Sequence, residues 1–124
     1  MNKKRVNNWL PVAKDVLVQT GIAENGKIGK TYRSMISSFG ATVVMGSFKS
    51  AVALFSANGE SSVERARLVS AMYRVIYGQH KDAVDIYKIV CDQDSTELKD
   101  AFIDASIALK LAMNFFELVK EVPR

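Results

Sequence analysis

The chain has 124 residues, enough for one domain with a sizeable core and too few for two ordinary domains. Its hydrophobic fraction of 48% excludes an intrinsically disordered chain, and its single cysteine excludes an intramolecular disulfide. The formal charge of +4 is uneven: residues 1–81 hold 12 Lys and Arg against 4 Asp and Glu, whereas residues 82–124 hold 5 against 9. The first part is basic and the second acidic, so we expect a polyanion to meet the first part.

The composition also indicates in which cellular compartment the protein is expected. A chain without disulfides fits a reducing cytoplasm, and the basic N-terminus lacks the apolar core and cleavage site of a signal peptide. The best candidate for a membrane span, residues 35–48, is interrupted by serines and glycines and is too short to cross a bilayer. We therefore expect a cytoplasmic protein with no membrane partner.

Apolar residues recur at helical spacing along the whole chain, and only Pro11 and Pro123 oppose long helices. We predict an all-α fold, a single domain over residues 1–124 that forms a compact bundle of about six helices. The first helix is expected to begin near the N-terminus and to end near Thr20, and Pro11 is tolerable in it if the regular helix starts near Asn8, which places the proline in the first turn. The others are expected at 30–45, 47–57, 61–77, 81–91 and 96–121.

Turn and capping residues mark two of the breaks. Asn25 and Gly26 predict a tight turn before the second helix. Gly46 is expected to close that helix in a left-handed conformation, after which Ser47 caps the third helix.

Signatures of catalysis and metal binding are weak. The segment 26–31, GKIGKT, resembles the end of a P-loop, but Glu24 stands where the motif needs its first glycine, and no hydrophobic strand is predicted before it. A turn followed by a helix start is the favoured interpretation.

His80 is expected in a solvated loop and Cys91 in the core, so they form no predicted catalytic pair. The acidic residues of 92–104 lack the order of a calcium loop, so we predict no metal, no cofactor and no enzymatic activity.

The basic residues are the remaining signal, because phosphate binding needs cations held at intervals along one surface. Three of them are spaced by three residues at the start of the second helix, one lies on the third helix, and two share a face of the fourth. The predicted nucleic-acid-binding residues are Lys27, Lys30, Arg33, Lys49, Arg67 and Arg74. Ordinary solubilising charges are the alternative interpretation. A base-reading helix-turn-helix is disfavoured, because the helix at 47–57 is mostly apolar.

Two segments carry a likeness to a known family. Tyr32-Arg33 begins an apolar helix that breaks at residues 45–46 and continues into the run AVALF at 51–55. Near the C-terminus, an Ala- and Leu-rich run at 105–111 leads to two phenylalanines, a leucine and a lysine within 115–120. In these patterns and in its size, the chain resembles the small subunit of the type III-B CRISPR–Cas (Cmr) effector complex over residues 5–122.

The resemblance implies a non-catalytic, all-α subunit that stacks in short rows beside the backbone subunits of an RNA-guided complex in antiviral defence. Its implied partners are other Cmr subunits, the crRNA, the target RNA and further copies of itself. It carries Lys30 and Arg33 over as RNA-facing residues, whereas the other predicted contacts come from charge and spacing. The opposite charges of the two parts of the chain fit a stack in which one subunit's basic end docks on the next one's acidic end.

Two other functions stay open. A protein-binding helical module without nucleic-acid binding would use the last helix, where Ile103, Ile107 and Leu111 lie off the main apolar seam. A small helical enzyme acting on a nucleotide would need an intact P-loop or a cluster of histidine and acidic residues, and the sequence shows neither.

Overall fold

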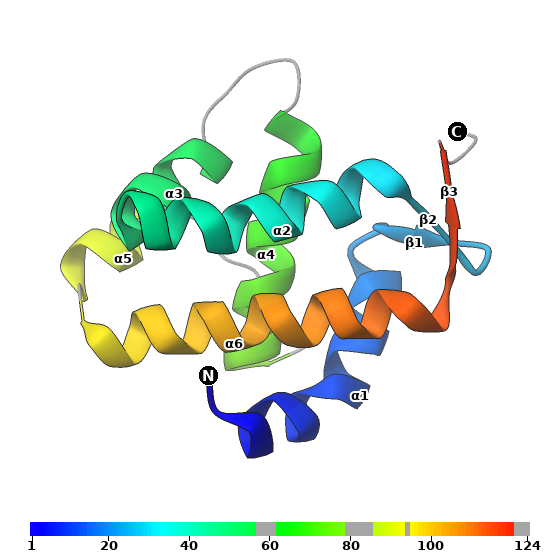
Figure 1. Cartoon of the computed structure of the whole chain (residues 1–124), viewed down its shortest axis with the longest axis horizontal. Helices are drawn as coiled ribbons and strands as arrows, with labels where there is room; N and C mark the ends of the chain where they lie inside the picture. The colour runs from blue at the N-terminus through cyan, green and yellow to red at the C-terminus, as the bar shows by residue number, and fades with distance from the viewer. Residues whose placement is uncertain (57–61, 79–85, 94, 121–124) are drawn as a thin grey trace.

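The computed structural model describes residues 1–56, 62–78, 86–93 and 95–120. These residues form a mostly helical domain with one small sheet (Figure 1). The helices are α1 (Lys3–Gln19), α2 (Lys30–Met45), α3 (Phe48–Ser56), α4 (Ser62–Tyr77), α5 (Ile86–Asp92), α6 (Thr96–Ala112) and the 3-10 turn η1 (Met113–Phe115). The strands are β1 (Ala23–Glu24), β2 (Lys27–Gly29) and β3 (Glu117–Val119). The predicted helical class is confirmed, and the sheet is an addition that the helical patterns did not predict.

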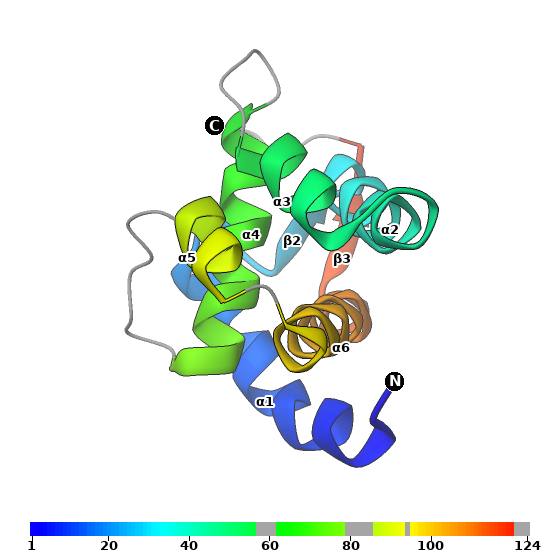
Figure 2. The ribbon, with the colours of Figure 1, turned by 90° about the vertical axis from the view of Figure 1, so that its left-hand side faces the viewer.

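Helix α6 lies at the centre of the domain. It packs against α1, α2 and α4, and it runs alongside α2 while α4 crosses behind both (Figures 1 and 2). Phe102, Ala105 and Leu109 are fully buried on it. Ile103 and Ile107 are half-buried and pack against the same core. The apolar excess of this helix therefore serves mainly contacts within the domain.

The break between α2 and α3 folds these helices against each other. Phe39 and Phe55 meet edge to face, with ring centroids 5.2 Å apart. Gly46 has φ −113° and ψ −106°, so the expected left-handed closure of α2 is wrong. A Cβ on Gly46 would lie 3.1 Å from the Thr42 carbonyl oxygen, so close backbone approach explains the glycine. The predicted cap is confirmed, because the Ser47 hydroxyl accepts a hydrogen bond from the Ser50 N–H at 3.0 Å.

The sheet joins two segments that are distant in the sequence: the hairpin that precedes α2 and the strand that follows α6. Strands β1 and β2 form an antiparallel hairpin through Asn25 and Gly26, whose φ angles of 54° and 75° confirm the predicted turn. Strand β3 then pairs with β2 in parallel and places Leu118 beside Ile28. Because a two-stranded hairpin is marginal alone, the third strand stabilises it.

This pairing corrects the predicted end of the last helix. The helix was expected to reach residue 121, but α6 ends at Ala112 and Phe116 is already extended, at φ −119° and ψ 159°. The Glu117 N–H donates to the Gly26 carbonyl at 2.9 Å. The open edge of β2 thus supplies the backbone partner that a continued helix would have supplied locally.

The first helix begins near the N-terminus, as predicted. The Asn2 side chain accepts a hydrogen bond from the Arg5 N–H at 3.0 Å, and this N-cap starts α1 at Lys3. Pro11 consequently lies inside the helix instead of in its first turn. Since proline has no N–H, the Asn7 carbonyl cannot receive its usual helical hydrogen bond.

Replacing Pro11 by alanine is therefore expected to stabilise the domain. An interior proline costs a helix about 3 kcal/mol relative to alanine, and proline regains up to about 1 kcal/mol by restricting the unfolded chain. The expected gain in the free energy of unfolding is about 2 kcal/mol, measured by urea denaturation. Asn8→Ala, an exposed change in the same helix, is the control and is expected to gain less than about 1 kcal/mol. Equal or lower stability of the Pro11→Ala variant would contradict this account.

Candidate nucleic-acid interface

The pairing of α2 with α6 brings cations from both helices to one end of their shared face. The Arg33 Nη1 donates to the Asn114 Oδ1 at 3.0 Å and to the Lys110 carbonyl at 3.4 Å. Around this contact lies an open pocket of about 380 Å³, which we call the Arg33 pocket. It is lined by Lys30, Arg33, Ser34, Ser37, Lys110 and Leu118. Three cations and two hydroxyl groups therefore converge there.

A second pocket, also of about 380 Å³, lies near the opposite end of α2. It holds two cations, Lys49 from α3 and Lys99 from α6, and we call it the Lys49 pocket. Its other lining residues are Val43, Gly46, Ser47, Phe48, Ser95 and Thr96. Arg33 and Val43 are ten residues apart on α2, so the two pockets are separated by about 15 Å along that helix. Together they form the α2–α6 basic face, and among the described residues, which do not include Asp94, no acidic residue lines either pocket.

Lys99 and Lys110 were missed because they belong to the acidic part of the sequence. Helix α6 separates its charges by face rather than along its length. Lys99 and Lys110, eleven residues apart, lie on the side that meets α2, whereas Asp100 and Asp104 lie on the side that meets the start of α1. Helical spacing of charges within residues 96–112 is the signal that could have found both lysines.

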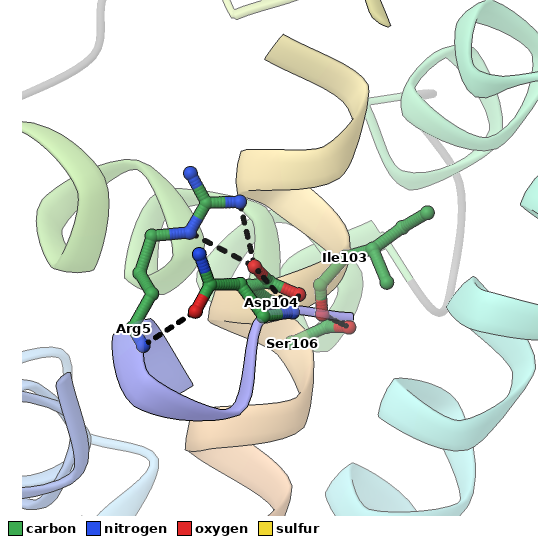
Figure 3. Close-up of polar contacts among 5 residues, drawn as sticks. Arg5, Ile103, Asp104 and Ser106 are labelled. Atoms are coloured by element: carbon green, nitrogen blue, oxygen red, sulfur yellow. Dashed lines mark hydrogen bonds and ion pairs between the residues drawn. The ribbon is translucent and has the colours of Figure 1, made fainter. Parts of the chain in front are cut away.

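The acidic side of α6 is paired within the domain. Arg5 reaches from the first turn of α1 and donates from Nε and Nη2 to the Asp104 Oδ2, at 2.9 and 2.6 Å (Figure 3). Glu97 and Asp100 line the same depression as Asn2 and Arg5. The basic N-terminus and part of the acidic C-terminal segment are therefore neighbours, so the charge division along the chain is partly cancelled in space.

The other predicted contact residues lie elsewhere. Lys27 on β2 has Glu117 as its register partner, and strand alternation places it on the opposite side from the buried Ile28. The Arg67 Nη1 donates to the Tyr32 hydroxyl at 3.0 Å, which ties α4 to α2. Arg74 lies two helical turns further along α4. Of the six predicted residues, the two pockets therefore include Lys30, Arg33 and Lys49.

The predicted core position of Cys91 is wrong, because this residue is exposed. Ile86 and Val90 supply the buried side of α5, which turns the residues one position later toward solvent. The neighbouring Tyr87 is 41% exposed. Hydrogen bonding to the Cys91 thiol raises the pKa of Tyr87 above its ordinary value of 10.0. His80 lies outside the described residues, so its relation to Cys91 is not described.

The P-loop-like segment 26–31 folds as a hairpin turn, the short strand β2 and the first residues of α2. The favoured interpretation, a turn followed by a helix start, is confirmed, with three residues of strand between them. Within the described ranges, no three His, Cys, Asp or Glu residues are placed to hold a metal ion. Nor is any helix in that part of the chain both long and apolar enough to cross a membrane.

No protein-family model, curated protein or solved structure matches this chain. The likeness to the Cmr small subunit accordingly rests on the sequence patterns described above, and it stays a prediction.

Proposed function

We propose that the protein is a non-catalytic small subunit of a type III-B CRISPR RNA-guided effector complex in the cytoplasm. In this proposal it stacks beside the backbone subunits and contacts guide or target RNA through the α2–α6 basic face. The observation that carries the RNA contact is the convergence of five cations from three helices on two pockets whose described lining residues include no Asp or Glu. The role in a Cmr complex rests on the sequence resemblance.

The side chains of the basic face suit phosphate rather than base recognition. Lysine and arginine donate charge-assisted hydrogen bonds to phosphate oxygens, and the Ser34 hydroxyl adds a neutral donor, whereas the Ser37 hydroxyl donates to the Arg33 carbonyl at 3.0 Å. Phe48 is the one aromatic residue among the described lining residues of the two pockets, and at 5% exposure it offers no open ring for base stacking. Binding is therefore expected to depend strongly on salt and weakly on RNA sequence.

Charge reversal on the basic face tests the proposal. In the variant Lys30→Glu/Lys110→Glu, two cations of the Arg33 pocket are lost while the Arg33 contact to Asn114 is kept. We expect at least about a tenfold loss of affinity for a labelled single-stranded RNA, and a slope of log K against log salt reduced by about 1.4. Fluorescence anisotropy over a salt series measures both quantities.

The control is Lys3→Glu/Lys4→Glu, which makes the same charge change at exposed positions at the start of α1. Circular dichroism of both variants checks that the helices are retained. Equal losses in the two variants would mean that net charge alone attracts RNA. Unchanged RNA binding by the Lys30→Glu/Lys110→Glu variant would refute this assignment of the RNA site.

One observation favours the alternative of a protein-binding helical module. Val18, Leu111 and Phe115 are 57%, 44% and 59% exposed, and Lys14 places its ammonium 5.0 Å from the centre of the Phe115 ring. One helical turn separates Val18 from Lys14 and Leu111 from Phe115, so α1 and the end of α6 share an exposed apolar area. Absence of any RNA shift at low salt would favour this alternative.

A further inference from the structure

The two pockets of the basic face differ in charge although their volumes are alike. The Arg33 pocket gathers three cations, and the Lys49 pocket gathers two. Internal phosphates of RNA are diesters with a single negative charge. A terminal phosphate is a monoester that carries about −1.5 to −2 at pH 7 and presents three acceptor oxygens. The richer set of donors in the Arg33 pocket therefore matches the terminal group better than the internal one.

The Arg33 side chain is held ready for such a ligand. Its two hydrogen bonds, to Asn114 and to the Lys110 carbonyl, both come from Nη1. The guanidinium carries five N–H donors in a rigid plane, so the orientation of its Nε and Nη2 donors is fixed by those bonds. A donor group positioned in advance loses less entropy when an anion binds.

The sheet marks one end of the basic face. Strands β2 and β3 stand where α2 begins and α6 ends, and Leu118 of β3 lines the Arg33 pocket (Figure 1). Leu118 is half-buried and packs against the core. The Arg33 pocket therefore has an apolar lining residue at the end of the basic face that the sheet marks, and we expect the end of an RNA strand to lie there.

We propose that the Arg33 pocket binds a terminal phosphomonoester of RNA, while the Lys49 pocket binds an internal phosphodiester of the same strand. This proposal rests on the proposed RNA-binding function and specifies the part of the RNA that each end of the face takes. A 5′-phosphate and a 3′-phosphate offer the same chemistry, so the experiment has to distinguish them.

The test compares three labelled RNAs of one sequence: one with a 5′-phosphate, one with a 3′-phosphate, and one with hydroxyl groups at both ends. The label is placed on an internal base, and the full chain is titrated at one salt concentration. One of the phosphorylated RNAs is expected to bind about tenfold more tightly than the RNA without a terminal phosphate, because charge-assisted hydrogen bonds are added. The identity of that RNA tells which terminus the pocket takes.

Two lysine variants locate the effect. Lys110→Ala is expected to remove the preference for the phosphorylated end, and Lys30→Ala is expected to reduce it. Lys99→Ala, in the Lys49 pocket, is the matched control and is expected to weaken all three RNAs equally while keeping the preference. A preference that survives in both pocket variants would overturn the assignment to the Arg33 pocket.

The outcomes separate this proposal from the one on which it rests. Equal binding of the three RNAs by the unmodified chain would overturn the terminal-phosphate site and leave the phosphate-binding face standing. Failure to bind any of them at low salt would overturn both.

Discussion

Replacing Phe102 by alanine is expected to lower the free energy of unfolding by about 4 kcal/mol. The side chain is fully buried at the centre of α6, and its ring lies 5.3 Å from that of Phe48 on α3. Alanine would leave a cavity that two packed helices close only in part, so the loss of contacts adds to the loss of apolar burial. Chemical denaturation followed by circular dichroism measures the change.

Leu111→Ala provides the control on the same helix. Leu111 is 44% exposed, so its truncation removes less buried surface, and we expect a loss of no more than about 1 kcal/mol. The conservative variant Phe102→Leu should fall between the two. If Phe102→Ala and Leu111→Ala destabilised the protein equally, α6 would not be the central element of the core.

Local sequence patterns were sufficient to predict α2, whose buried face follows from the spacing of residues within one helix. The residues Tyr32, Ile36, Phe39 and Val43 recur at helical spacing in the sequence, and all four are buried on α2. The predicted bounds of α2 agree with the structure at both ends. Burial of a continuous stripe and a glycine break are properties that neighbouring residues determine together.

A contact between distant segments explains the error at the end of the last helix. The end of α6 depends on a strand that begins nearly ninety residues earlier, and helical periodicity contains no information about that edge. The cap at Asn2 starts α1 well before Asn8, so the condition that would have placed Pro11 in the first turn is not met. Tertiary packing of α1 against α6 compensates for the hydrogen bond that the proline removes.

The candidate site was predicted only in part: three of the five cations that line the two pockets were among the residues predicted from the sequence. Lys30 and Arg33 were found because they lie close together in the sequence. Lys99 and Lys110 were missed because charge was counted along the chain, where acidic neighbours outnumber them. The fold turns these acidic neighbours toward α1 and leaves the lysines beside α2. A predicted helix therefore needs its charge assessed by face before a segment is judged acidic or basic.

Replacing Arg5 by alanine is expected to lower the free energy of unfolding by about 3 kcal/mol. Asp104 is 1% exposed and accepts two hydrogen bonds from Arg5. The Asn2 N–H lies 3.4 Å from its carboxylate oxygens and contributes more weakly. Without the guanidinium, the buried carboxylate loses its charged partner, and the desolvation of that charge is no longer offset.

The geometry sets the size of this effect. The Arg5 side chain is 32% exposed, which reduces the strength of the pair, so the lower end of the range measured for buried ion pairs applies. Arg5→Lys keeps the charge but cannot donate from two nitrogens to one oxygen, so we expect an intermediate loss. Chemical denaturation of the two variants beside the parent chain measures both values.

A double variant without either charge decides whether the buried charge is the cause. In Arg5→Met/Asp104→Leu, both charges give way to apolar side chains, and we expect this variant to be more stable than Arg5→Ala. If the double variant were as unstable as Arg5→Ala, lost packing, including the contact of Arg5 with the Trp9 ring at 5.1 Å, would explain the effect instead. Arg5 lies outside both pockets of the basic face, so its variants should bind RNA normally under conditions in which they are folded. That separation would show that the acidic side of α6 maintains the fold while its basic side remains available to a ligand.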